Sequence, residues 1–196
     1  MTRIEKGQLA LFGAGPTLPE GFRYQAGVIS LEEEARLLER IRELPFKEFQ
    51  FHGFTGKRRT VSFGWKYSFA DEKLYESDDI PPFLASLRDV AAEFAGLQGR
   101  DLQQVLVTEY DAGAAIGWHR DKAVFGHVVG ISLLSSCPFR MRRKAGSTWE
   151  RVTVTAEPRS AYLLRGPSRN EWEHSIPPVE NLRYSVTFRN LRAAPS

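Results

Sequence analysis

Between Gln104 and Leu134 the chain reads QVLVTEYDAGAAIGWHRDKAVFGHVVGISLL, and this stretch decides the fold class. Polar and apolar residues alternate at its two ends, Gln104–Tyr110 and Val128–Leu134, which is the period of a β-strand with one buried face. The same pattern continues towards the C-terminus in short segments separated by turn residues: Pro138–Arg143, Trp149–Thr155, Ala161–Arg165, Trp172–Ile176 and Tyr184–Leu191. So many short strands in under about 100 residues predict a sandwich or barrel of the jelly-roll kind.

Two helices are predicted upstream of this strand-rich region. Ser30 stands three residues before Glu33, and this capping box begins a helix whose apolar residues recur at helical spacing until Pro45 stops it. A second helix should follow Pro81-Pro82 and end near Gly96. Residues 46–69 between them are strand-like, and we expect them to extend one sheet.

We therefore expect one domain over residues 1–196, of the α+β class and mainly β. Its core is a jelly roll, or double-stranded β-helix, over residues 101–192. Residues 26–100 supply the two flanking helices and additional strands. Residues 1–25 are rich in Gly and Pro, and we expect them to form an N-terminal arm on the surface of the domain.

The composition fits a globular domain with its own core. Of the 196 residues, 42% are hydrophobic and 26% charged, which is an ordinary globular mixture. Cys137 is the single cysteine, so we expect a reducing compartment, no internal disulfide and no cysteine-based zinc site. The first residues lack the apolar run of a signal peptide, and no stretch reaches the roughly 18 apolar residues of a membrane span. We expect a cytoplasmic protein that does not enter membranes.

The chain is mildly basic, and some of its basic residues lie in two clusters. The net charge is +3 and the pI about 9.1, which permits attraction to phosphates without demanding it. Residues 57–59 form one basic cluster, and a second lies between Arg140 and Lys144. Either cluster could contact nucleic acid or be a solvated face.

Two histidines and an aspartate form a candidate metal site. In an extended chain residues two apart point the same way, so His119 and Asp121 can bind one ion. His174, on another predicted strand, is the best third ligand. Two imidazoles and one carboxylate on one face of an ion form the facial triad of non-haem iron(II) oxygenases, which leaves positions open for a co-substrate and dioxygen. Zinc also suits these ligands, and each histidine alone could be an ordinary core or surface residue.

Arg183 and Arg189 stand six residues apart on the last predicted strand, so both share a face with Ser185 and Thr187. Inward-facing arginines are costly unless anions neutralise them. A dicarboxylate such as 2-oxoglutarate would do so, because a guanidinium matches carboxylate geometry with two parallel hydrogen bonds. The alternative is an edge strand with both arginines in solvent, which the apolar opposite face of the strand makes less attractive.

Taken together, these residues resemble the AlkB family of oxidative dealkylases. The resemblance covers roughly residues 104–192, with weaker likeness from Lys57 to Phe69. It rests on Tyr110, the His119-x-Asp121 motif, His174 and the closing Arg183-x5-Arg189 signature.

The resemblance implies roles for these residues. His119, Asp121 and His174 would bind iron(II), with 2-oxoglutarate and dioxygen as co-substrates. Arg183 and Arg189 would hold the two ends of 2-oxoglutarate. Tyr110 would donate to one carboxylate, and Thr108 stands where the family commonly has Asn, so its shorter side chain could bind the co-substrate differently.

The resemblance also implies a substrate side of the site. A Lys-Tyr-Ser run that ends at Ser68 is similar to the family's substrate-lining strand. Phe63, Trp65 and Tyr67 alternate there, so we expect them on one face, where they could stack on a flipped base or belong to the core. Arg143 lies in a region that touches nucleic acid or substrate in relatives.

The activity that the resemblance implies is oxidative dealkylation of N-alkylated bases in DNA or RNA, coupling 2-oxoglutarate decarboxylation to methyl hydroxylation and formaldehyde release. We expect a monomer acting on a single strand or on a flipped base. Ala123 stands where many relatives place an acidic residue facing the damaged base, which leaves open a protein or small-molecule substrate. A non-catalytic nucleic-acid-binding module is a third reading, against which the intact triad and arginine pair argue.

Overall fold

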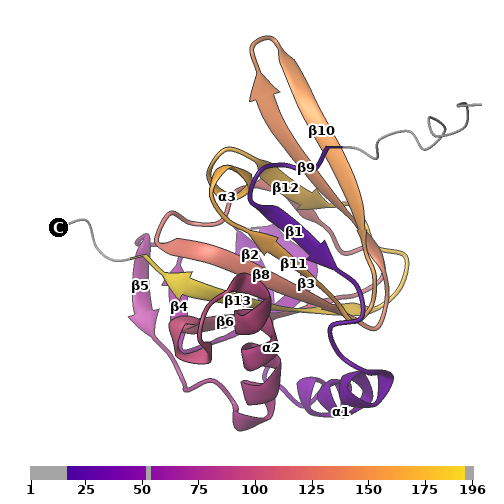
Figure 1. Ribbon diagram of the computed structural model, residues 1–196. Coiled ribbons are helices and arrows are strands. Elements are labelled where there is room, and N and C mark those ends of the chain that lie inside the picture. The colour runs from indigo at the N-terminus through magenta and orange to yellow at the C-terminus, as the bar shows by residue number, and fades with distance from the viewer. Residues whose placement is uncertain (1–16, 52–53, 193–196) are drawn as a thin grey trace, which may run out of the picture.

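Two antiparallel β-sheets face each other in the computed structural model, which describes residues 17–51 and 54–192 (Figure 1). The larger sheet has the strand order β1-β11-β8-β13-β6-β3-β2. In chain order its strands are Phe22–Gln25 (β1), Lys47–Phe51 (β2), Phe54–Phe63 (β3), Gln104–Tyr110 (β6), Phe125–Leu133 (β8), Ser160–Leu164 (β11) and Arg183–Leu191 (β13). This arrangement confirms the predicted mainly β, jelly-roll architecture.

The smaller sheet has the order β10-β9-β12-β7. Its strands are Ile116–His119 (β7), Cys137–Ala145 (β9), Thr148–Ala156 (β10) and Glu173–Ile176 (β12). The β9–β10 hairpin extends beyond the body of the domain (Figure 1). A separate two-stranded hairpin of Trp65–Ser68 (β4) and Lys73–Glu76 (β5) lies beside the larger sheet.

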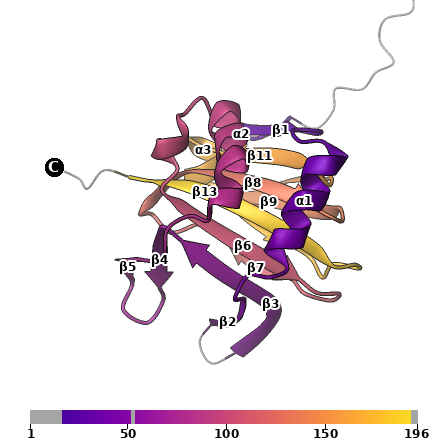
Figure 2. The ribbon, with the colours of Figure 1, turned by 90° about the horizontal axis from the view of Figure 1, so that it is seen from below.

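Helices cover the outer face of the larger sheet, as Figure 2 shows. They are α1 (Leu31–Ile41) and α2 (Ala85–Ala95). The chain also forms the short helix α3 (Pro167–Asn170) and two 3-10 turns, η1 (Pro82–Leu84) and η2 (Gly99–Asp101). The capping box of Ser30 and Glu33 is formed, and Gly96 ends α2 with a left-handed φ of 72°. None of the helices within the described residues has the length and apolar character needed to cross a membrane.

Strand alternation gives the larger sheet two distinct faces. Its outer face packs on α1 and α2 through side chains such as Val107, Ile131 and Val186. Its inner face meets the smaller sheet through a second apolar cluster that includes Val128, Phe139 and Trp172. The polar side chains of β13 lie on this inner face, so the space between the sheets is where the candidate site forms.

The structure corrects three of the sequence predictions. The expected N-terminal arm is not confined to the surface, because its end forms β1, which pairs with β11 and buries Phe22. The first helix ends at Ile41, before Pro45. A third, one-turn helix, α3, was not predicted, although Pro167 stands at its first turn, where proline is favoured.

Candidate functional site

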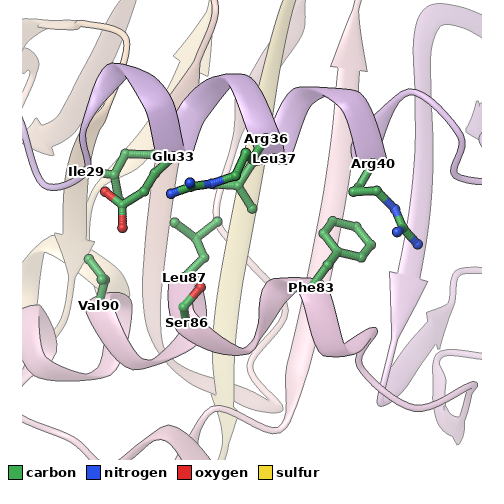
Figure 3. A pocket seen from close by; sticks show the side chains of 9 residues that line it. All are labelled: Ile29, Glu33, Arg36, Leu37, Arg40, Phe83, Ser86, Leu87 and Val90. Carbon is green, nitrogen blue, oxygen red and sulfur yellow. The ribbon is translucent and has the colours of Figure 1, made fainter.

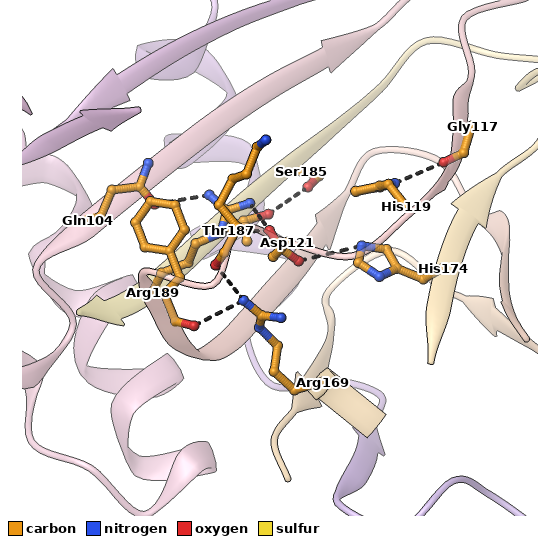
Figure 4. A network of polar contacts seen from close by, with 11 residues as sticks. Gln104, Gly117, His119, Asp121, Arg169, His174, Ser185, Thr187 and Arg189 are labelled. Atoms are coloured by element: carbon orange, nitrogen blue, oxygen red, sulfur yellow. Dashed lines mark hydrogen bonds and ion pairs between the residues drawn. The ribbon is translucent and has the colours of Figure 1, made fainter. Parts of the chain in front are cut away.

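His119, Asp121 and His174 come together between the sheets, as the sequence predicts (Figure 4). His119 ends β7 and stands directly opposite His174 of the neighbouring β12. Asp121 follows two residues after His119. One ligand atom of each residue lies within 4.8 Å of the others, and His174 Nε2 is 3.6 Å from Asp121 Oδ2. Such a cluster can hold one metal ion.

The two oxygen atoms of the Asp121 carboxylate have different surroundings. Its Oδ1 accepts hydrogen bonds from Arg189 Nε at 3.0 Å and Arg189 Nη2 at 2.7 Å. Arg189 is itself held by Gln104, whose Oε1 accepts from Nη1 at 2.9 Å. Asp121 Oδ2 is buried and has no hydrogen-bond partner among the described residues. A buried carboxylate oxygen without a partner is costly, so the structure fits a cation at this position.

Hydrogen bonding and burial prepare both imidazoles for a metal. His119 Nδ1 lies 2.8 Å from the Gly117 carbonyl, which can only accept, so Nδ1 carries the proton and Nε2 keeps its lone pair. Burial, followed by the neighbouring charge of His119, lowers the pKa of His174 to about 3. Burial also lowers the pKa of His119. Both rings are therefore neutral, the form that binds metal, at physiological pH.

The pKa of Asp121 is lowered as well. Burial alone would raise the pKa of this carboxyl, but the Arg189 guanidinium and the two imidazoles outweigh it. Asp121 is thus an anion at neutral pH. The loop that follows it is held by Arg169 of α3, whose Nη2 donates to the carbonyls of Lys122 and Phe125 at 2.7 and 2.9 Å. The role of Arg169 was missed because α3 was missed.

Arg183 is the second buried arginine of β13 and only 1% exposed. Its Nη2 donates to Ser132 Oγ at 2.8 Å, and its guanidinium lies 4.7 Å from the centre of the Tyr110 ring. Its Nε and Nη1 are buried without a hydrogen-bond partner among the described residues. A guanidinium with two unsatisfied N–H groups in the interior fits a bound carboxylate.

Hydroxyl groups line the inner face next to Arg183. Ser185 pairs in register with Ser132 on one side and with Thr108 on the other. Tyr110 pairs with Arg183 two residues further along the same two strands. Thr108 and Tyr110 are both buried on this inner face, where the sequence predicts them. Ser132 was missed, although its alternation with Ile131 and Leu133 could have indicated an inward position.

The two arginines therefore differ in their surroundings. Both lie on the inner face of β13, which confirms the predicted orientation. Only Arg183 has unsatisfied donors, whereas the guanidinium of Arg189 is bonded to Asp121 and Gln104. Arg189 thus acts on the metal ligand, a contact that sequence spacing did not indicate.

The β4–β5 hairpin forms one rim of the site. Lys122, the residue after Asp121, places its ammonium 5.0 Å from the centre of the Tyr67 ring and 5.2 Å from that of Phe69. The two rings pack edge to face at 5.3 Å. Lys122 thus connects the hairpin to the metal-binding segment through cation–π contacts.

The prediction that Phe63, Trp65 and Tyr67 share one face is wrong. Gly64 separates β3 from β4 with a left-handed φ of 74°, and a Cβ there would lie 2.1 Å from the Gln103 carbonyl oxygen. Because alternation breaks at this residue, Phe63 points into the core under α2 and cannot line the site. Trp65 lines a separate hollow with Gln103. Tyr67 alone of the three contacts a residue next to the triad.

Two other predicted substrate residues are engaged elsewhere. The Ser68 hydroxyl is hydrogen-bonded to Asp71 within the β4–β5 turn, which lowers the pKa of that carboxyl. Arg143 lies on the β9–β10 hairpin, where it donates to Glu150 at 2.8 Å and to Glu171 at 2.7 Å. Its guanidinium lies over the Trp172 ring at 5.2 Å. These contacts explain both side chains without a substrate.

A hollow between α1 and α2 lies on the opposite side of the larger sheet (Figure 3). Leu37, Phe83 and Leu87 form its apolar wall, and Arg36 and Arg40 lie at its edge (Figure 3). These residues belong to the helical layer, whereas the metal-ligating cluster lies between the sheets. The chemistry of this chain is therefore assigned to the site in Figure 4.

Two imidazoles, one carboxylate and a nearby unsatisfied guanidinium, set inside a jelly roll, are the donor set of a non-haem iron enzyme that uses a 2-oxo diacid. The family model of the 2OG-Fe(II) oxygenase superfamily matches residues 21–189. The chain belongs to this superfamily. It is an iron(II)- and 2-oxoglutarate-dependent dioxygenase, with iron(II) as cofactor and 2-oxoglutarate and dioxygen as co-substrates.

Curated relatives agree with the predicted AlkB type. The chain is 27% identical over 162 residues to the Alkylated DNA repair protein ALKBH8 homolog of Arabidopsis thaliana, covering 69% of this chain and 47% of the relative. It is 26% identical over 181 residues to tRNA (carboxymethyluridine(34)-5-O)-methyltransferase ALKBH8 of Mus musculus, covering 89% and 27%. The chain thus spans less than half the length of these two relatives.

Solved structures share the fold. The structure of OsALKBH1 matches with a TM-score of 0.67 at 15% identity, covering 89% of this chain and 98% of that one. A Pseudomonas putida prolyl-4-hydroxylase matches with a TM-score of 0.58 at 14% identity, covering 88% and 94%. Both likenesses confirm the predicted double-stranded β-helix.

Proposed function

We propose that this dioxygenase acts on nucleic acid and removes alkyl groups from the nitrogen atoms of bases in DNA or RNA. The names of both relatives refer to nucleic acid, as alkylated DNA in one and tRNA in the other. The observation that carries the proposal is the aromatic hairpin β4–β5, which Lys122 ties to the metal-binding segment. Tyr67 and Phe69 offer a planar base a stacking surface beside the triad.

The triad and the arginines divide the work of the site. His119, Asp121 and His174 would hold iron(II), which with 2-oxoglutarate and dioxygen supplies the oxidising power to hydroxylate a methyl carbon. The Arg183 guanidinium would bind the far carboxylate of 2-oxoglutarate through the two N–H groups that lack partners. Tyr110 and Thr108 border this end of the pocket and would contact the co-substrate.

Arg189 has a positioning role in this proposal. By binding Oδ1 of Asp121 it fixes the carboxylate plane and leaves Oδ2 without a hydrogen-bond partner, so that Oδ2 would be available to hold the metal. It also keeps Asp121 ionised. The apolar side chains of Phe139 and Met141 close the site on the side of the smaller sheet and exclude water from it.

The substrate side is mildly basic at the rim. Arg120 stands between the metal ligands His119 and Asp121 in the sequence, and its side chain is exposed. Its Nη1 donates to the Asn170 carbonyl at 3.1 Å. Lys122 lies two residues further on. Phosphates that flank a base in the site would meet these cations, which position a strand without reading its sequence. Oxidation of the N-methyl carbon would give a hydroxymethyl group that leaves as formaldehyde and restores the base.

The proposal is tested with methylated single-stranded DNA and RNA oligonucleotides incubated with iron(II), ascorbate and 2-oxoglutarate. We expect loss of the methyl mass in at least one oligonucleotide and one formaldehyde released for each 2-oxoglutarate consumed. His174→Ala is the matched inactive control. Steady consumption of 2-oxoglutarate with every oligonucleotide unchanged would overturn the nucleic-acid assignment and favour a protein or small-molecule substrate.

A further inference from the structure

Tyr162 is an aromatic residue inside the jelly roll, close to the candidate site. It lies in the middle of β11, between Ala161 and Leu163, which point into the helical side of the core. Tyr162 points the other way and packs against the apolar cluster between the sheets. It therefore faces the same space as the metal triad and Arg183.

Gly130 makes room for the Tyr162 ring. The two residues pair in register between β8 and β11. A Cβ added at Gly130 would lie 2.2 Å from Tyr162 Cζ, 2.3 Å from Cε1 and 2.4 Å from the hydroxyl oxygen. The φ angle of Gly130 is not left-handed, so the backbone conformation does not require a glycine here. The absence of a side chain instead leaves the space that the Tyr162 ring occupies. The phenol end of Tyr162 accordingly lies over the backbone of β8.

The position of the phenol end relative to the site follows from its neighbours. Gly130 pairs on its other side with Thr187 of β13, and Ser132, which binds Arg183, stands two residues along the same strand. The Tyr162 ring stacks on Phe139 at 4.4 Å, and Phe139 stacks in turn on His174 at 5.4 Å. The phenol thus lies between the metal triad and Arg183.

The hydroxyl of Tyr162 is a donor that lacks a partner. It makes no hydrogen bond to any of the described residues. Burial, followed by the nearness of Tyr110 and Asp121, raises the pKa of this phenol, so it stays protonated at neutral pH. This hydroxyl is therefore free to donate a hydrogen bond to a ligand in the space between the sheets.

We propose that the Tyr162 hydroxyl donates a hydrogen bond to 2-oxoglutarate bound between the triad and Arg183, which makes Tyr162 a further co-substrate-binding residue. The inference rests on the proposed role of Arg183 as the anchor of the far carboxylate. It explains three observations together: the glycine opposite the ring, the stack through Phe139 to a metal ligand, and the unpaired donor.

The test is the affinity for 2-oxoglutarate of protein loaded with manganese(II), which occupies the site without turnover, measured by calorimetry. A hydrogen bond to a charged acceptor is worth about 1.5–3 kcal/mol, so Tyr162→Phe should weaken binding roughly 10-fold to 100-fold. Steady-state kinetics should show KM for 2-oxoglutarate rising more than kcat falls. Tyr24→Phe is the matched control, because Tyr24 pairs with Tyr162 in the sheet but its hydroxyl already accepts a hydrogen bond from the Glu157 backbone N–H at 3.1 Å.

A second variant keeps the hydroxyl and displaces it. Gly130→Ala should push the ring aside and weaken 2-oxoglutarate binding in the presence of Tyr162, with a smaller effect in a Tyr162→Leu background. Binding by Tyr162→Phe within twofold of the original protein would overturn the inference while leaving Arg183 intact. If the original protein itself showed no manganese-dependent binding of 2-oxoglutarate, the proposed function would fall together with the inference.

Discussion

Replacing Arg183 with methionine separates what this residue does for binding from what it does for folding. Its guanidinium is fully buried, bonds only Ser132 Oγ and has two N–H groups without partners among the described residues. Without a bound anion this charge is largely uncompensated. Replacing a buried charge by an apolar side chain of similar volume is often neutral or stabilising by about 1–4 kcal/mol.

Binding should change in the opposite direction. Hydrogen bonds to charged groups contribute about 1.5–3 kcal/mol each, so the loss of two should cost about 3 kcal/mol or more. That corresponds to a dissociation constant for 2-oxoglutarate raised roughly a hundredfold or more. Arg183→Met should therefore unfold in urea at the same or a higher midpoint than the original apoprotein, yet lose the stabilisation that added manganese(II) and 2-oxoglutarate confer.

Urea unfolding with and without the two ligands measures both effects in one series. Arg183→Lys is the control, since it keeps the charge but loses the planar fork, and it should bind 2-oxoglutarate with intermediate affinity. The reasoning is refuted if Arg183→Met binds 2-oxoglutarate within threefold of the original protein.

Three further outcomes are expected. The apoprotein should lose stability as the pH falls below about 6.5, because unfolded histidine takes up a proton there whereas folded His174 does so only near pH 3. The free energy of unfolding, measured by urea denaturation, should fall by about 1.4 kcal/mol per pH unit, and by less in His174→Gln. Glu34→Ala should destabilise the protein by about 3 kcal/mol, because the buried Glu34 carboxylate binds Arg159 at 2.6 Å and accepts from the Leu134 backbone N–H at 2.8 Å. Both of these partner residues have a positive φ. An unchanged midpoint of thermal unfolding would contradict this prediction. Lys122→Met should reduce hydrogen-exchange protection in the β4–β5 hairpin and leave that of α2 unchanged, because two cation–π contacts are lost.

Features that depend on local periodicity could be predicted from the sequence. Gln104–Tyr110 reads as a strand in the sequence and is found as β6 with the same bounds. The even spacing of Arg183 and Arg189 placed both on one face of one strand, and burial confirms it. The metal triad was accessible for the same reason, since His119 and Asp121 are near neighbours in an extended segment and His174 lies on a strand with an apolar face.

Features that depend on contacts between distant segments could not be predicted from the sequence. The hydrogen bond from Arg189 to Asp121 joins residues that are 68 positions apart, and the sequence around neither residue indicates it. The left-handed turn at Gly64 broke an alternation that looked continuous from Phe63 to Tyr67. The pairing of Gly130 with Tyr162 depends on which strands become neighbours in the sheet, and strand order is not encoded in the alternation itself.

The central claim is that three side chains bind one iron(II) beside a pocket for 2-oxoglutarate. Anaerobic titration of the apoprotein with iron(II) in the presence of 2-oxoglutarate, followed by the visible charge-transfer absorption of the chelate, tests it most directly. We expect the absorption to saturate at one iron per chain, and to be absent in His174→Ala. Absorption that fails to appear in the original protein, or that appears equally in His174→Ala, would contradict the account.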